Sequence, residues 1–153
     1  MFEFLRFYTV YLALASGVIG LISWHKLPVR KAKFLVILIW FSAVIEKVGY
    51  YFTAWTGILN YYVFNFYMLV SFSAYILLIR SILSKKNHRK AGLLGFILFI
   101  VSFFLNTLYF KEDLNHSYTY SFAIGVLLIT ILSCLYLVEI FNSDKILNFK
   151  KSV

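Results

Sequence analysis

Five apolar stretches, each long enough to cross a bilayer, constrain the fold of this chain more than any other feature. A helix rises about 1.5 Å per residue, so about 20 apolar residues cross a hydrocarbon core about 30 Å thick. Backbone groups in lipid need internal hydrogen-bond partners, and the stretches lack the alternation of barrel strands, so each is expected to be an α-helix. The predicted spans are Phe7–Trp24, Phe34–Ala54, Tyr61–Leu83, Ala91–Phe110 and Thr119–Phe141.

The composition predicts an all-α, polytopic transmembrane helix bundle that forms a single domain over residues 1–153. The chain is 62% hydrophobic and only 14% charged, whereas soluble proteins average about 25% charged residues. Its longest polar stretches, Ser84–Lys90 and Lys111–Ser117, have the length of loops rather than of domains. We therefore expect no separate soluble domain.

Topology explains the net charge of +9 better than nucleic-acid binding does. Most of the basic residues fall on one side of the predicted membrane, and the positive-inside rule makes that side cytoplasmic. The N-terminus is then outside, and the C-terminus with its three lysines is in the cytoplasm. These cytoplasmic basic residues are expected to meet anionic lipids or a protein partner. In the two cytoplasmic connections they are Lys26, Arg30, Lys31, Lys33, Arg80, Lys85, Lys86, Arg89 and Lys90, and after the last span Lys145, Lys150 and Lys151.

Two ionisable residues, Glu46 and Lys47, lie deep in the second predicted span. Glu46 is about 18 Å along the helix from Phe34, close to the middle of the membrane. An ionised carboxylate at that depth costs at least about 2.5 kcal/mol, so Glu46 is expected to be neutral, paired or hydrated. Lys47 points about 100° away from Glu46, so it either snorkels to the surface or meets a polar group on another helix.

Helical spacing places Glu46 on a polar stripe with Ser42, Gly49 and Thr53, and we expect this stripe to face the bundle. Polar residues of other spans fall at a similar depth. Two interpretations are open: a ligand or ion site centred on Glu46, or a hydrogen-bond network that sets helix register. The candidate site residues are Glu46, Lys47, Ser42, Tyr50, Asn65, Asn106 and Ser121.

Small residues at helical spacing predict where the spans pack closely. The first span carries the overlapping pairs Ala13/Gly17 and Ser16/Gly20, and the last span carries Ser121 and Gly125. Small side chains let helix backbones approach one another in lipid. Glu139, near the cytoplasmic end of the last span, is expected to reach water.

The sequence indicates a protein that is not an enzyme and that holds no metal or cofactor. It contains no Gly-rich phosphate loop, no H-E-x-x-H motif and no nucleophile elbow. Its three histidines, His25, His88 and His116, fall in three different predicted connections and are not expected to converge on a metal.

The order of features resembles a group of small, uncharacterised bacterial seven-helix membrane proteins. The resemblance rests on Glu46 before Val48-Gly49-Tyr50-Tyr51, on the Tyr/Asn-rich start of the third span at 61–67, and on Asn106 near the end of the fourth. It implies residence in the bacterial inner membrane and two further helices, absent here or supplied by a partner. Size, span number and basic loops are also similar to membrane accessory proteins of RNA-targeting CRISPR effectors.

Three functions follow as hypotheses. The first is a non-enzymatic sensor or regulatory component with a polar site around Glu46 in the outer half of the membrane. The second is a transporter or channel subunit, in which Glu46 is a coupling or selectivity carboxylate and homo-oligomerisation completes the pathway. The third is a membrane-acting defence accessory protein.

Overall fold

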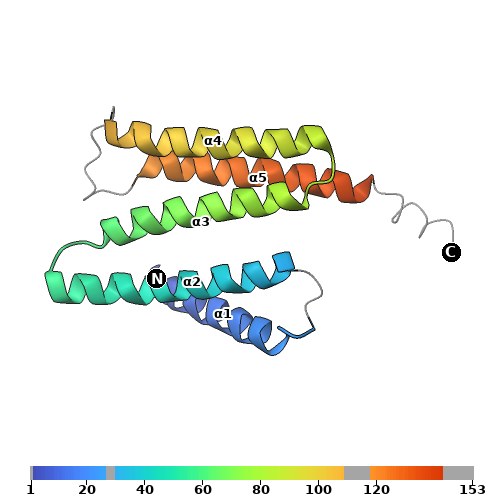
Figure 1. Ribbon diagram of the computed structural model, residues 1–153. Coiled ribbons are helices and arrows are strands. Elements are labelled where there is room, and N and C mark those ends of the chain that lie inside the picture. The colour runs from blue at the N-terminus through green and yellow to red at the C-terminus, as the bar shows by residue number, and fades with distance from the viewer. Residues whose placement is uncertain (1, 27–29, 109–117, 143–153) are drawn as a thin grey trace. The chain divides into compact units, whose positions relative to one another are not determined.

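The chain folds into five α-helices over residues 2–26, 30–108 and 118–142, the parts that the computed structural model describes (Figure 1). The described residues include no strand, and the predicted all-helical class is confirmed. The Lys111–Ser117 connection and the C-terminal lysines lie outside the described residues. The helices are α1 (Phe2–Ile22), α2 (Arg30–Thr56), α3 (Tyr61–Ile82), α4 (Lys86–Leu108) and α5 (Thr119–Phe141).

Three of these helices are long and apolar enough to cross a membrane. They cover Tyr61–Ile82, Lys86–Asn106 and Thr119–Phe141. Helices also occupy the positions of the first and second predicted spans. The number of spans and their orientation stay predictions, as does the single-domain organisation.

Three helices begin earlier than the apolar stretches predict. Helix α1 begins at Phe2 rather than Phe7, α2 at Arg30 rather than Phe34, and α4 at Lys86 rather than Ala91. Hydropathy marks only the length that suits lipid, whereas backbone hydrogen bonding continues into the polar flank. The prediction that these flanks are loops was therefore wrong. The residues that lie in helices instead are Arg30, Lys31, Lys33, Lys86, His88, Arg89 and Lys90, and Arg80 lies in the last turn of α3.

The first compact unit runs from Met1 to Tyr67 and is built on the pairing of α1 with α2, which lie side by side in Figure 1. The Trp40 indole donates a hydrogen bond to the Gly17 carbonyl oxygen at 3.2 Å. A Cβ added at Gly20 would lie 2.7 Å from a methyl carbon of Val36. The predicted close packing at these glycines is confirmed, while the opposite face of α1 is exposed, as Leu12 and Ile19 show.

The second unit runs from Met68 to Val153, and in it α4 and α5 lie side by side (Figure 1). The remainder of α3 packs with them around a core of Ile76, Leu83, Phe99 and Leu132. Gly125 of α5 is buried against the Phe72 ring of α3. The predicted packing face at Ser121 and Gly125 is therefore confirmed, and Ser121 is fully buried.

Candidate functional site

The polar stripe of α2 contacts the first turns of α3 and the residue before them, at Ser42 and Gly49. The Ser42 hydroxyl donates to the Leu38 carbonyl oxygen at 3.0 Å and lies 2.7 Å from the Tyr67 hydroxyl. Because Ser42 has one proton and gives it to Leu38, Tyr67 is the donor in the second bond. The Tyr67 ring also packs against Phe41, with 5.9 Å between the ring centroids. This contact ties the middle of α2 to α3.

Further along the stripe, Gly49 provides room for the side chain that begins α3. Gly49 is buried, and a Cβ added there would lie 3.0 Å from the Asn60 Nδ2 atom and 3.6 Å from the Phe64 ring. Thr53 donates its hydroxyl to the Gly49 carbonyl oxygen at 3.2 Å. Glu46 lies between these two contacts along the stripe and is half-buried, whereas Lys47 is exposed.

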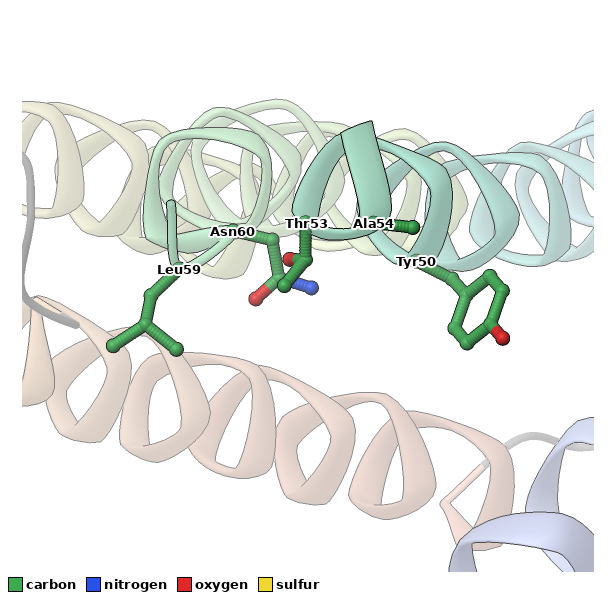
Figure 2. Close-up of a pocket in the computed structure, with 5 residues that line it drawn as sticks. All are labelled: Tyr50, Thr53, Ala54, Leu59 and Asn60. Atoms are coloured by element: carbon green, nitrogen blue, oxygen red, sulfur yellow. The ribbon is translucent and has the colours of Figure 1, made fainter. Parts of the chain in front are cut away.

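A pocket of about 340 Å³ opens where α2 passes into α3 (Figure 2). Tyr50, Thr53 and Ala54 of α2 line one side, and Leu59 and Asn60 of the connection line the other. Figure 2 shows the Asn60 amide beside Thr53, with the Tyr50 ring projecting from the next turn of α2. Of the predicted site residues, Tyr50 belongs to this pocket, and sequence reasoning missed Asn60.

The other candidate residues are buried in two different units. Asn65 of α3 is 3% exposed and belongs to the first unit. In the second unit, the Asn106 amide donates to the Ser121 hydroxyl oxygen at 2.8 Å, and Ser121 donates to the Ser102 carbonyl oxygen at 3.1 Å. The structure thus brings Asn106 and Ser121 together. The approach of Glu46 to them stays a prediction.

Glu139 is the centre of a hydrogen-bonded polar cluster in the second unit. Its carboxylate accepts hydrogen bonds from the backbone N–H groups of Ser84 at 2.6 Å and Lys85 at 3.0 Å. The His88 Nδ1 atom lies 2.7 Å from the same carboxylate. The Glu139 side chain is 7% exposed, and its contact with water stays a prediction. It binds the two backbone N–H groups that immediately precede α4, whose first turn carries no acidic residue.

Among the predicted cytoplasmic basic residues, Arg80 and Lys33 make defined side-chain contacts. Arg80 donates from Nε to the Arg89 carbonyl oxygen at 3.3 Å, and Gly92 gives its side chain room to pass along α4. The Lys33 ammonium nitrogen lies 5.3 Å from the centre of the Trp24 ring, within cation–π range. These contacts stabilise the helix ends on which the predicted basic surface lies.

Fold and site define an all-helical protein with at least three helices able to cross a membrane and a polar seam between α2 and α3. No family model, curated protein or solved structure matches the chain.

Proposed function

We propose that the chain is a non-enzymatic integral protein of a bacterial cytoplasmic membrane and that it acts as a sensor or regulatory component. Five spans, with the N-terminus outside and the C-terminus in the cytoplasm, are part of the proposal. The length of the apolar helices and the one-sided distribution of basic residues support this arrangement.

The observation that carries the proposal is the half-buried Glu46 on the seam between α2 and α3. The seam has Ser42 bonded to Tyr67 on one side of Glu46, and Gly49 seated against Asn60 on the other. A carboxyl group in an apolar hairpin is costly, and such groups mark functional sites by default. We infer that occupancy of the site around Glu46 favours one of two arrangements of α2 against α3. The basic helix ends then transmit this change of arrangement to a partner or to anionic lipid.

Reporter fusions test the proposed topology. A reporter that is active only in the cytoplasm is expected to be active when fused after Val153 and inactive when inserted between Lys111 and Ser117. The expectation follows from the excess of basic residues on the proposed cytoplasmic side. The opposite pattern would reverse the orientation, and the α2–α3 connection, which the proposed topology places outside, would then be cytoplasmic.

Glu46→Gln tests the sensor role directly. In the native host, a strain that lacks the gene is complemented with wild type or variant, and its transcript profile is measured. We expect Glu46→Gln to restore less than about a tenth of the wild-type response, because the variant lacks the carboxyl group on which the proposed site depends. The level of protein in the membrane should stay unchanged, because a neutral amide inserts more easily than a carboxyl group. Val44→Ala, at an exposed apolar position of the same helix, is the control and should restore the response. Full complementation by Glu46→Gln would reduce Glu46 to a packing residue.

An ion-flux measurement separates the sensor from the transporter alternative. Purified protein in liposomes with an internal pH dye is expected to leave them as tight to protons, Na⁺ and K⁺ as empty liposomes. A flux that appears with wild type and disappears with Glu46→Gln would replace the sensor by a transporter that uses Glu46 as its coupling carboxylate.

A further inference from the structure

The pocket at the α2–α3 connection is preformed, because the turn that bounds it is held by several hydrogen bonds. Gly57 takes a backbone φ of +67°, which favours glycine, and donates its N–H to the Thr53 carbonyl oxygen at 3.0 Å. The Thr56 hydroxyl donates to the Phe52 carbonyl oxygen at 2.7 Å and accepts from the Ile58 N–H at 3.2 Å. Leu59 and Asn60 therefore follow a turn that is held by hydrogen bonds.

Asn60 breaks the usual pattern of its position. It immediately precedes α3, and its carbonyl oxygen accepts the first helical hydrogen bond, from the Phe64 N–H at 3.1 Å. An asparagine at such a position commonly turns its side chain onto the first amides of the helix. Here the amide lies against Gly49 and lines the pocket, and among the described residues it has no hydrogen-bond partner. A residue that departs from its local preference points to a functional role.

The chemistry of the lining selects a neutral, hydroxylated ligand. Asn60 offers two N–H donors and a carbonyl acceptor, Tyr50 offers a phenolic hydroxyl, and Thr53 keeps acceptor capacity after donating to Gly49. None of the lining residues that the structure describes carries a charge, while Ala54 and Leu59 provide apolar contact. A volume of about 340 Å³ falls at the small end of ligand sites. This combination suits a sugar or glycerol unit and disfavours a phosphate or carboxylate.

The surroundings favour a ligand that is carried on a lipid. Trp55 is 85% exposed, and its ring lies 6.1 Å from that of Tyr51, which lies 5.6 Å from that of Tyr50. Ile58 and Leu59 are also exposed beside the pocket. Exposed aromatic clusters of this kind are enriched where helices meet the lipid headgroups. We propose that the pocket binds a neutral, hydroxylated group, a hexose or glycerol unit, borne by a membrane lipid or free in solution. The inference rests on the proposed function, because only a membrane protein brings this end of the hairpin to the headgroups.

Native mass spectrometry of the detergent-solubilised protein tests the inference with three probes: monoglucosyl diacylglycerol, phosphatidylglycerol and free methyl glucoside. Wild type is expected to retain the glucolipid at least threefold better than phosphatidylglycerol. Tyr50→Phe and Asn60→Ala should each weaken retention by about two- to tenfold, the factor that one net hydrogen bond supplies. Tyr51→Phe is the matched control, because its ring neighbours Tyr50 without lining the pocket, and it should bind as wild type does.

Each outcome decides a different part of the inference. Retention of methyl glucoside that Tyr50→Phe removes would support the ligand chemistry and assign it to a soluble sugar. Equal retention by all variants, or stronger retention of phosphatidylglycerol, would overturn the inference. If Asn60→Ala changes the oligomer size in the same spectra, its loss of retention no longer reports on the pocket, and the retention by Tyr50→Phe alone decides the inference. If the glucolipid binds but Glu46→Gln complements normally, the pocket proposal stands and the sensor proposal falls. If no probe binds but Glu46→Gln fails to complement, the sensor proposal stands and the pocket proposal falls.

Discussion

Gly125→Ala is expected to lower the free energy of unfolding by about 1–3 kcal/mol, the usual cost of overpacking a well-packed interior. Gly125 of α5 is buried, and an added Cβ would collide with the Phe72 ring of α3. That ring cannot simply move aside, because it packs against Phe99 and Phe122, each with 5.6 Å between ring centroids. The added methyl group must therefore push α5 away from α3. Unfolding by a gradient of denaturing detergent, followed by circular dichroism, measures the loss.

Gly95→Ala is the matched control for this substitution. Gly95 is also a buried helical glycine of the second unit, but its added Cβ would lie 3.5 Å from Leu128 and 3.8 Å from Leu132, at ordinary van der Waals distances. Alanine is favoured over glycine in a helix by about 1 kcal/mol. Gly95→Ala should then leave stability unchanged or raise it slightly. If the two variants unfold alike, the glycines act through helix propensity and the close approach at Phe72 carries no energetic weight.

The helices could be predicted because the property that defines them, apolar length, is local in the sequence. Helix α5 has the bounds that hydropathy predicts, Thr119–Phe141, while α4 begins five residues before the predicted Ala91. The predicted and observed starts of α4 differ because its polar first residues are helical, although their own sequence does not favour a helix. Basic residues at the start of α4 oppose the helix dipole, so the local sequence argues against a helix there.

The sequence predicts which residues of α2 share the face that carries the candidate site, but not which residues outside α2 contact that face. Helical periodicity correctly placed Ser42, Gly49 and Thr53 on one side of α2, because the period of a helix is fixed. Their partners, Tyr67 and Asn60, depend on how α3 packs against that side, which no local pattern encodes. Asn60 was missed for a further reason. A polar residue before a helix is normally explained as a cap, and only the structure shows its amide in the pocket.

Glu139→Ala is expected to destabilise the second unit by about 1–3 kcal/mol, because the carboxylate accepts both backbone N–H groups that lead into α4 and its removal leaves them unpaired. The substitution removes the acceptor for the Ser84 and Lys85 N–H groups and the partner of His88. The first turns of α4 should fray as a result. Amide hydrogen exchange should quicken at residues 86–90, while exchange in the buried core around Phe99 changes less.

The contribution of His88 to the same cluster can be isolated by a double-mutant cycle. Glu139→Gln keeps an acceptor oxygen for one backbone N–H group but loses the charge, so it should cost less than Glu139→Ala. His88→Ala leaves both backbone hydrogen bonds to the carboxylate in place and should cost less again. If His88 and Glu139 interact as their separation of 2.7 Å indicates, the double substitution costs less than the sum of the two single ones. Strict additivity would instead show that Glu139 stabilises α4 through the two backbone N–H groups alone, and that His88 is a neighbour without energetic weight.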